Sequence, residues 1–347
     1  MKIVHVNFAR GFRGGERQTL NLIEGLSELG IEQTLVCLPR AELAKRICAK
    51  AVQIVEITHP IMGHFTQRSF DLIHVHEARG AYWSAIERII RTTPYLITRR
   101  IPNLISNNRL TRSVYANASA LVGVSDNVSH GLQRQTARSV LTILDSCTRH
   151  EVDPHRVSMI RARLGGYPII GHVGALVDHH KGQSILIEAF KRFSVDYPDA
   201  RLVLVGEGPD RLFFEKLADN DNRIIFAGFQ DDIGCWIAAM DLFAFPSREE
   251  GLGSSVLDAM LLKIPVVVAA VGGLPQLIGE QQRGKLVMSH RPESWCGALR
   301  SVIEDLPAQK NKLDAAFAFA VENDVGAMVR RYLSVYESIL GNSQGIA

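Results

Sequence analysis

Cysteine is scarce in this sequence, and its few copies are not arranged as a metal site or a disulfide framework. The 347 residues include five cysteines, at positions 37, 48, 147, 235 and 296. The number is odd, the spacing is wide and no Cys-x-x-Cys pair occurs, which argues against both structural zinc and paired disulfides. We therefore expect a reducing environment, with neither a zinc site nor a disulfide framework.

Long apolar runs are missing as well. The longest covers residues 264–274 and has about half of the roughly 20 residues that a helix needs to cross a bilayer. Residues 1–6 enter a strand pattern directly, without the apolar region and cleavage site of a signal peptide. We expect a cytoplasmic protein that contacts the inner face of the cytoplasmic membrane at most peripherally and does not span it.

Charge of one sign is not in excess over the whole chain, whose formal net charge is +3. The two halves differ, however. Residues 1–150 hold 19 Lys and Arg against 11 Asp and Glu, a net charge of +8, whereas residues 151–347 hold 20 against 25, a net charge of −5. A basic half is suited to an anionic partner.

The length suggests two domains, at roughly 150 residues per domain. Hydrophobic residues make up 46% of the chain and charged residues 22%, which is typical of a globular protein and too apolar for a disordered one. Each half is long enough to bury a core of its own.

Short runs rich in β-branched residues alternate with helical patterns, which is typical of parallel α/β units with crossover helices. The strands predicted in the first half cover residues 2–8, 33–38, 52–57, 72–76, 95–98 and 121–124. Those predicted in the second half cover residues 169–173, 201–205, 224–227, 242–245 and 266–269. The helices predicted between them include residues 16–29, 184–194 and 255–262.

This pattern predicts the α/β fold class, with two Rossmann-like doubly wound domains that face each other across a cleft. We place an N-terminal domain at residues 1–155 and a C-terminal domain at 156–325. A final helix over residues 326–347 is expected to pack back toward the N-terminal domain. Ligands of doubly wound sheets bind beyond the carboxyl ends of the strands, so motifs at those ends carry the most weight.

Glycine-rich segments follow the first strand of each half. Gly14 and Gly15 precede a helix, where they allow close backbone approach and the helix N–H groups favour an anion, although a plain flexible turn is the alternative. In the second half, Gly174 ends a strand and Lys181 stands at the start of the next helix. Its ammonium group can neutralise a diphosphate there, or it can simply be solvated.

The most specific segment follows the strand predicted at 242–245. Gly251 and Gly253 open a phosphate-sized site at a helix N-terminus. Glu250 is placed to accept hydrogen bonds from sugar hydroxyls. Asp258, one turn into the helix, can accept from a ribose, although its spacing from a serine three residues earlier also fits a capping box.

One segment resembles the G-x-G-x-x-G fingerprint of dinucleotide-binding proteins but lacks its third glycine. Gly206 and Gly208 follow a strand, but Arg211 occupies the position of the last glycine in the fingerprint. The sequence therefore argues against a nicotinamide cofactor.

Taken in order, these segments resemble the retaining glycosyltransferases of the GT-B fold, family 4 (glycosyl transferases group 1), over nearly the whole chain. The resemblance is carried by the following segments, which occur in the family's order: residues 14–16, 71–77, 124–125, 173–182, 206–209, 226–228, 241–247, 250–253 and 272–275. It implies transfer of a sugar from a nucleotide diphosphate donor to an acceptor with retained anomeric configuration, usually without a metal. Neither a metal nor another cofactor is therefore expected, and the nucleotide-sugar is a co-substrate.

The resemblance also implies roles for individual residues. Lys181 would bind the donor diphosphate, Glu250 the hydroxyls of the donor sugar, and Asp258 the ribose. The other donor-binding positions would be Gly14, Gly15, Gly174, Gly251, Leu252 and Gly253. A departing diphosphate gains charge in the transition state, so fixed cations and helix N–H groups would accelerate the step. Lys181 and Glu250 are accordingly predicted to be catalytic.

A third predicted catalytic residue is His76, which stands at a strand end that faces the cleft in the family pattern. It is expected to contact the reacting sugar, and the alternative is a structural histidine beneath the turn at Gly14 and Gly15. Retaining transfer of this kind needs no protein nucleophile, so none is assigned.

The sequence departs from the family at several positions. Ala175 stands where many members carry an arginine on the diphosphate, Asp258 where a glutamate is usual, and Gln276 where a glutamate is frequent. Arg99 and Arg100 follow a threonine where many members have Thr-x-His. Arg100 cannot act as a base at neutral pH, so both arginines are expected to bind a phosphate or carboxylate of the acceptor.

The acceptor is expected to be anionic, because arginines cluster in the first half. The cluster comprises Arg88, Arg91, Arg99, Arg100, Arg109 and Arg112. Such a surface suits an anionic saccharide or glycolipid, or the anionic leaflet of a membrane. Nucleic acid is not expected, because no recognition fold accompanies the charge. Residues 14–18 and 180–183 are similar to bacterial enzymes that build lipopolysaccharide core, which favours a role in lipopolysaccharide or other cell-envelope polysaccharide synthesis with a UDP-sugar donor.

Two other functions stay open. A GT-B-fold UDP-sugar 2-epimerase would share the nucleotide pocket but need no acceptor. A non-catalytic sugar-nucleotide-binding protein would account for Ala175 and Arg100 without any transfer.

Overall fold

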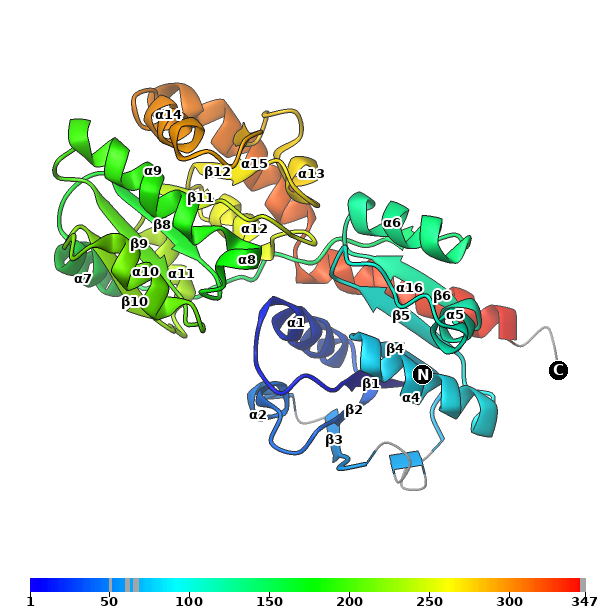
Figure 1. Cartoon of the computed structure of the whole chain (residues 1–347). Coiled ribbons are helices and arrows are strands. Elements are labelled where there is room, and N and C mark those ends of the chain that lie inside the picture. The colour runs from blue at the N-terminus through cyan, green and yellow to red at the C-terminus, as the bar shows by residue number, and fades with distance from the viewer. Residues whose placement is uncertain (50–51, 60–62, 65–68, 344–347) are drawn as a thin grey trace. The chain divides into compact units, whose positions relative to one another are not determined.

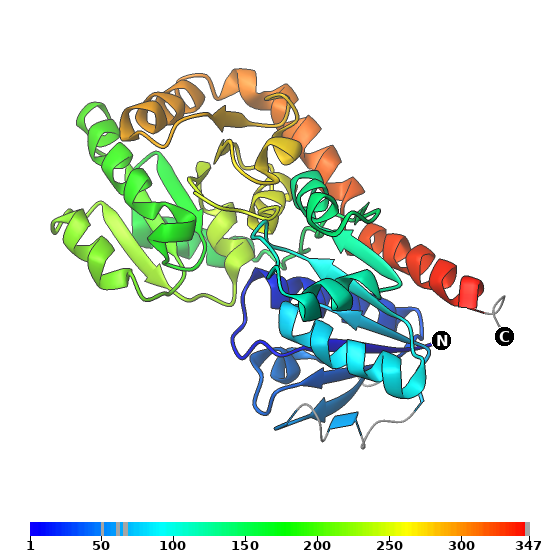
Figure 2. The same cartoon turned by 45° about the vertical axis from the view of Figure 1, so that its right-hand side comes forward.

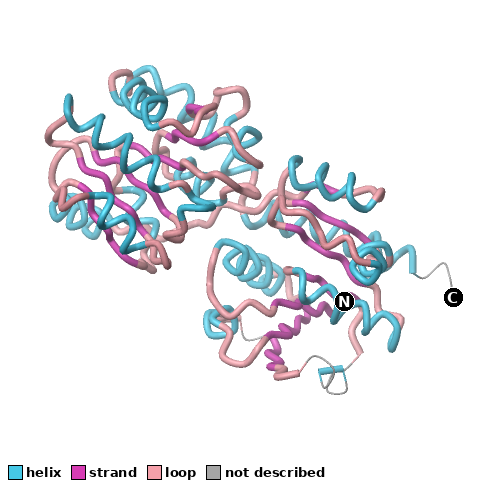
Figure 3. The backbone as a smooth tube through the Cα atoms, viewed as in Figure 1, coloured by secondary structure: helices cyan, strands magenta, loops and turns pink. Residues whose placement is uncertain are grey.

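The computed structural model describes residues 1–49, 52–59, 63–64 and 69–343. They form two units, the first made of Met1–Ser146 with Val325–Ala347 and the second of Cys147–Asp324. In each unit a sheet of parallel strands lies between helices (Figure 3). The predicted α/β class, with two Rossmann-like parallel-sheet domains, is thereby confirmed.

The first unit is built on a seven-stranded sheet in the order β3-β2-β1-β4-β5-β6-β7. Its strands are β1 (Lys2–Asn7), β2 (Glu32–Cys37), β3 (Val52–Glu56), β4 (Leu72–Val75), β5 (Tyr95–Arg99), β6 (Ala120–Gly123) and β7 (Leu141–Thr142). The described helices of this unit are α1 (Gly14–Glu28), α2 (Glu42–Arg46), α4 (Ala78–Arg91), α5 (Arg109–Ala116), α6 (Asp126–Thr136) and α16 (Val325–Ser343) (Figure 1). Strand order changes direction at β1 and β4, which is where ligands bind in doubly wound sheets.

Both faces of this sheet are covered by helices. On one face, α1 and α16 pack on β1, β4, β5 and β6 through a cluster that includes Leu22, Leu96 and Tyr332 (Figure 2). On the other face, α4 and α5 pack through a second cluster that includes Trp83 and Tyr115. Burial on both faces explains why these strands are apolar runs rather than alternating patterns.

The second unit contains a six-stranded sheet in the order β10-β9-β8-β11-β12-β13. Its strands are β8 (Ile169–Val173), β9 (Arg201–Val205), β10 (Ile224–Gly228), β11 (Leu242–Phe245), β12 (Val266–Ala269) and β13 (Lys285–Val287). Its helices are α7 (Pro154–Leu164), α8 (Asp178–Lys181), α9 (Gln183–Asp196), α10 (Arg211–Ala218), α11 (Ile233–Ala238), α12 (Ser254–Leu261), α13 (Leu274–Ile278), α14 (Pro292–Ile303) and α15 (Lys310–Glu322), with a 3₁₀ turn at Pro307–Gln309. Here the order changes direction at β8 and β11.

The predicted strands all occur, and two further ones were missed. β7 has two residues and β13 has three, too few for an alternating or continuous apolar pattern to stand out. The helix predicted at 16–29 begins earlier, because Gly14 and Gly15 are the first residues of α1 instead of a preceding turn. Among the described helices, none combines the length and apolar character that a bilayer crossing requires.

The boundary between the units differs from the predicted one at 155/156, since residues 147–155 belong to the second unit. Hydrogen bonds account for this. Cys147 N donates to Asn323 O over 3.1 Å, and Thr148 N donates to Asp258 Oδ1 over 2.7 Å. The segment is therefore attached to α12 and to the end of α15.

The last helix returns to the first unit. α16 buries Met328, Val329, Tyr332 and Tyr336 in the cluster that it shares with α1, while residues 344–347 of the predicted helix lie outside the described residues. The two helices approach closely because α1 carries Gly25 at the contact. A Cβ added there would lie 2.6 Å from Val329 Cγ2.

This close approach predicts opposite effects for one substitution at two helical glycines. Gly25→Ala should lower the free energy of unfolding by about 1–3 kcal/mol, because the methyl group overpacks the contact with α16. In α6, a Cβ at Gly131 would meet no described atom within 4 Å. Gly131→Ala should therefore raise it by about 0.5–1 kcal/mol through helix propensity. Urea unfolding followed by circular dichroism measures both, and stabilisation by Gly25→Ala would contradict the packing.

Candidate active site

In the second unit, the site begins where β8 and β11 end. The two strands are parallel neighbours, so the loops that follow them meet at one edge of the sheet. These loops supply Lys181 and Glu250, whose Nζ and Oε2 atoms lie 2.5 Å apart in an ion pair. The Lys181 ammonium also lies 5.1 Å from the centre of the Phe245 ring. Two predicted site residues are thus brought together from positions far apart in the chain.

The Glu250 carboxylate is anchored on both oxygens. Ser247 Oγ donates to Oε2 over 3.3 Å, and Gly251 N donates to Oε1 over 3.2 Å. The side chains of Lys181 and Glu250 are 23% and 15% exposed. The pair is therefore accessible to a ligand but ordered by its surroundings before one arrives.

Two glycines allow the loops to approach this closely. Gly182, at φ +64°, lies where a Cβ would be 2.4 Å from Pro246 O. Gly272, at φ +57°, lies where a Cβ would be 1.7 Å from Glu250 O. Any other residue at either position would push the loop that carries Glu250 away from its place.

The remaining glycine positions line the same strand ends. Gly174 directly follows β8, and a Cβ there would lie 3.0 Å from His172 Nε2. Gly253, at φ +94°, is the N-cap residue of α12, and no side chain caps this helix N-terminus. Gly251 and Leu252 are buried beside it. The α12 N–H groups thus lie next to the loop that carries Glu250.

Asp258 is held by the segment that enters the second unit. Its Oδ1 accepts from Thr148 N over 2.7 Å, its Oδ2 accepts from His150 Nε2 over 3.1 Å, and the residue is 5% exposed. The alternative of a capping box is wrong, because α12 begins at Gly253 without a side-chain cap. A ribose hydroxyl at Asp258 would have to share these oxygens with Thr148 and His150.

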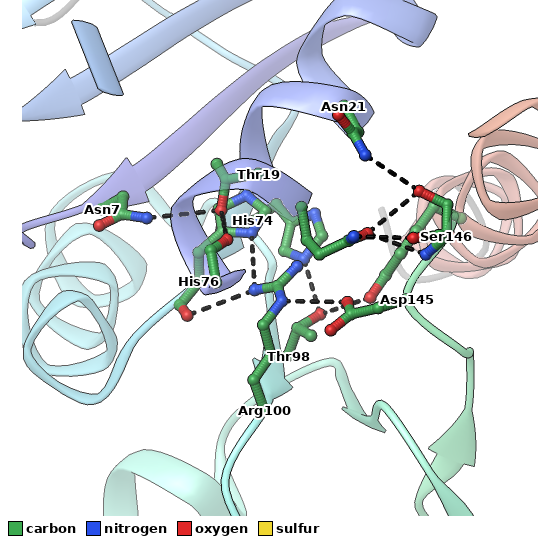
Figure 4. A network of polar contacts seen from close by, with 12 residues as sticks. Asn7, Thr19, Asn21, His74, His76, Thr98, Arg100, Asp145 and Ser146 are labelled. Carbon is green, nitrogen blue, oxygen red and sulfur yellow. Dashed lines mark hydrogen bonds and ion pairs between the residues drawn. The ribbon is translucent and has the colours of Figure 1, made fainter. Parts of the chain in front are cut away.

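In the first unit, three histidines meet beneath the ends of β1 and β4. His5, His74 and His76 are buried, and the rings of His74 and His76 stack with centroids 4.0 Å apart (Figure 4). His74 Nδ1 lies 2.7 Å from the Tyr336 hydroxyl, and His74 Nε2 lies 2.8 Å from Thr98 Oγ1. Both nitrogens of His76 are engaged too, Nε2 by His5 over 2.9 Å and Nδ1 by Arg100 over 3.4 Å.

Burial governs the ionisation of these rings. It lowers the pKa of His5 to about 4, an effect that the hydrogen bond to Gln33 only partly offsets. Burial, together with the neighbouring rings and the charge of Arg100, holds the pKa values of His74 and His76 well below the ordinary value. All three histidines are neutral at pH 7.

The same trio is the one group of histidine, cysteine or acidic side chains, within the described parts of the chain, whose atoms converge closely enough for a metal. Their ring nitrogens already have hydrogen-bond partners, and the cationic Arg100 adjoins His76. A second cation there would meet repulsion instead of free lone pairs. The cluster is better explained as a hydrogen-bonded network than as a metal centre.

Arg100 contacts the hydrogen-bonded network of the three histidines, whereas Arg99 does not. Arg100 Nε lies 3.1 Å from Asp145 Oδ1, and its side chain is 9% exposed. Burial is the largest single influence and lowers the pKa of Arg100, but the charge and hydrogen bond of Asp145, together with Tyr332 and Glu16, leave the pKa raised. Arg99 instead donates to Asn103 O over 2.9 Å, because successive residues of a strand point to opposite sides. A Cβ on Gly15 would lie 3.6 Å from Arg100 Cδ, so the start of α1 adjoins Arg100.

The sequence interpretation missed most of this network. The missed residues are His5, Gln18, Asn21, Gln33, Asp145 and Ser146 in the first unit, with His150 and His172 in the second. The available signal was a polar residue inside a continuous apolar strand, as at His5, His74 and His172. Buried polar groups need partners, but the sequence does not say which ones they find.

Comparison with known proteins shows similarity to glycosyltransferases. Residues 167–305 match the family model described as glycosyl transferases group 1. Over 325 residues the chain is 26% identical to the lipopolysaccharide core biosynthesis glycosyltransferase LpsE of Rhizobium meliloti, covering 88% of this chain and 89% of that protein. It is 30% identical over 210 residues to the 2-deoxystreptamine glucosyltransferase of Streptomyces kanamyceticus, covering 56% of this chain and 53% of that enzyme, so it spans about half of that relative's length.

Solved structures establish the fold over the whole length. The Anabaena protein HepE, in its crystal structure with UDP-glucose, superposes with a TM-score of 0.87 at 20% identity, covering 97% of this chain and 100% of that one. Residues 167–305 are thus similar to the group 1 glycosyltransferases, and the chain as a whole has the GT-B fold.

The buried histidines predict acid sensitivity. The pKa of His5 is about 4 in the folded protein and near 6.5 in an unfolded chain. Between these values the unfolded chain binds the additional proton, so the free energy of unfolding should fall as the pH falls from 6.5 to 4. Each such histidine contributes a slope of up to about 1.4 kcal/mol per pH unit. Unfolding by urea at pH 7, 6 and 5 measures this loss.

His172 in the second unit has a pKa of about 4 for the same reason, burial, so both units should be sensitive. His130 is exposed on α6, and His130→Gln is the matched control that should leave the slope unchanged. A stability that is flat between pH 7 and pH 5 would contradict the burial of these rings as neutral groups.

Proposed function

We propose that the protein is a retaining glycosyltransferase that moves a sugar from a UDP-sugar to an anionic saccharide or glycolipid acceptor. The proposed setting is lipopolysaccharide core or other cell-envelope polysaccharide synthesis. The observation that carries the proposal is the ordered, accessible Lys181–Glu250 ion pair at the ends of β8 and β11, inside the segment that matches the family model. The likeness to HepE, whose crystal structure contains UDP-glucose, supports the choice of donor.

In the proposed donor site, Lys181 exchanges its partner Glu250 for the donor diphosphate. In the protein alone, Lys181 is neutralised by Glu250. A diphosphate brings greater negative charge and can take over the ammonium group, with the α12 N–H groups at Gly253 assisting. Glu250 is then free to accept hydrogen bonds from the sugar hydroxyls. Charge that develops on the departing diphosphate is stabilised by Lys181, which is already in place.

The proposed assignment needs no metal. Lys181 and the helix N–H groups supply positive charge at the diphosphate, and we assign no protein nucleophile. Asp258 is a proposed ribose contact only if the hydroxyl shares its oxygens with Thr148 and His150. Gly174, which directly follows β8 and precedes Lys181 in the chain, is the remaining proposed contact of the donor in this loop.

Removing the charges of the pair tests the donor site. Lys181→Ala should weaken UDP binding about tenfold or more, because a charge-assisted contact is lost, as measured by calorimetry. Glu250→Gln should leave UDP binding nearly unchanged but lower sugar transfer about tenfold or more, because an ionised acceptor for the sugar hydroxyls is lost. Transfer is measured on lipopolysaccharide from truncated-core strains.

Neighbouring residues provide the controls. Lys191→Ala alters a partly exposed lysine of α9, and Glu249→Gln an exposed glutamate next to the site; both should behave as the wild type. Unchanged UDP binding by Lys181→Ala would refute the diphosphate site. Isomerisation of a UDP-sugar without acceptor would favour the 2-epimerase, and binding without any transfer would favour a non-catalytic role.

A surface on α4 supports the proposed contact with an anionic membrane. Ile86, Ile89 and Ile90 are 37%, 81% and 54% exposed and share one face of the helix. Arg88 and Arg91 belong to the last turn of the same helix. Apolar side chains beside arginines suit the boundary between acyl chains and anionic headgroups.

Vesicle binding tests this surface. The wild type should cosediment with vesicles that contain phosphatidylglycerol and remain in solution with phosphatidylcholine alone. Ile89→Glu should weaken binding about tenfold, since it removes an apolar contact and adds a repelled charge. Leu212→Glu, at a residue 71% exposed in the second unit, is the matched control. Equal binding to both vesicle types would refute the membrane contact.

A further inference from the structure

A chain of hydrogen bonds leads from Arg100 into the interior of the first unit. Arg100 Nη1 lies 3.4 Å from His76 Nδ1. His76 Nε2 lies 2.9 Å from His5 Nδ1, and His5 Nε2 lies 2.9 Å from Gln33 Oε1. The chain joins β5, β4, β1 and β2, and it places a polar link on each of these neighbouring strands or at its end.

The direction of this chain is set at its inner end by the amide of Gln33. Gln33 Nε2 donates to Ile23 O over 2.9 Å and to Ser27 Oγ over 2.8 Å. The Ser27 hydroxyl donates its own hydrogen to Ile23 O, so it can only accept from Gln33. Turning the amide around would bring its oxygen against the carbonyl of Ile23, and Gln33 Oε1 therefore faces His5.

The acceptor at Gln33 determines the tautomer of both histidines. His5 Nε2 must carry a hydrogen to donate to Gln33 Oε1, and because the ring is neutral, His5 Nδ1 is an acceptor. His76 Nε2 must then donate to it, which leaves His76 Nδ1 without a hydrogen. That bare nitrogen accepts from Arg100. All donors in the chain thus point from Arg100 toward Gln33, and bonds aligned in this way reinforce one another.

The guanidinium of Arg100 has hydrogen-bond partners at two of its three nitrogens (Figure 4). His76 takes Nη1 and Asp145 takes Nε. Nη2 is buried and has no hydrogen-bond partner among the described residues. The side chain as a whole is only 9% exposed. The start of α1 at Gly15 adjoins the same side chain, and its N–H groups favour negative charge.

We infer that Gln33 and His5 are positioning residues, which act through His76 to hold Arg100 so that its Nη2 group receives an oxyanion of the substrate. The identity of that oxyanion as a phosphate or carboxylate of the acceptor rests on the proposed function. The tautomers do not, because they follow from the hydrogen bonds and from the neutral state of the buried rings. His76 is in this account also a positioning residue, which replaces its predicted contact with the reacting sugar.

The first test uses the unaltered full-length protein. Two-bond ¹H–¹⁵N spectra of histidine-labelled protein at pH 7 distinguish the two neutral tautomers and the charged ring. We expect neutral Nε2–H rings for both His5 and His76. An Nδ1–H or charged ring at either residue would overturn the inference, whether or not the protein transfers sugar.

The second test follows the Arg100 Nε–H signal during titration with inorganic phosphate. The signal should shift and saturate in the wild type, while that of Arg138, whose guanidinium donates to three backbone carbonyls, stays in place. Gln33→Leu should weaken this binding about tenfold, because a charge-assisted hydrogen bond is misplaced. Gln53→Leu, at an exposed glutamine of the adjacent β3, should change nothing.

The outcomes separate the two parts of the inference. An Arg100 signal that ignores phosphate would refute the oxyanion site, and an unchanged affinity in Gln33→Leu would refute the positioning role. If Gln33→Leu does not fold, Gln33→Ala takes its place, because it removes the same acceptor from His5 Nε2. It should then give a mixture of His76 tautomers, and a single unchanged tautomer would count against the inference. Sugar transfer by the wild type remains the separate test of the proposed function.

Discussion

Strands that run in one direction within each sheet are the constraint on which both candidate sites depend. Every strand pair described in either unit is parallel, so the carboxyl ends of all strands meet at one edge. At the change of strand order in the second unit, this brings Lys181 to Glu250. At the corresponding place in the first unit it brings His76 to Arg100.

Burying polar groups at these strand ends is costly unless their partners are supplied. In the first unit, every ring nitrogen of the three histidines has a hydrogen-bond partner. Arg100 is only partly satisfied, since Asp145 balances its charge but its Nη2 group has no partner among the described residues. The second unit keeps its own charged pair partly exposed, so a ligand can compete for Lys181. One unit therefore presents a fixed cation and the other an exchangeable one. This difference fits the proposed roles, in which the first unit holds an anion of the acceptor and the second unit releases the donor diphosphate.

Asp258 illustrates how one spacing can have several meanings. Its distance along the chain from a serine fits a capping box, and its distance from Glu250 fits the family's pair of carboxylates. In the structure it instead holds the segment at Thr148 and His150, through which the chain enters the second unit. That segment lies more than 100 residues away in the sequence, so no local pattern could have indicated the contact. The same contact moves the boundary between the units ahead of its predicted place.

The sequence by itself determined the α/β class and eleven of the strands with nearly their observed ends, because apolar runs and glycine-flanked strand ends are local signals. It also singled out Lys181, Glu250 and Arg100 as candidate site residues. It did not reveal the short strands β7 and β13, the partners of His76 and Asp258, or the role of Gln33. Those depend on contacts between distant segments, such as His5 with His76 and Tyr336 with His74. Only the tertiary structure decided them, because a buried polar atom takes whichever partner the packing brings within hydrogen-bond distance.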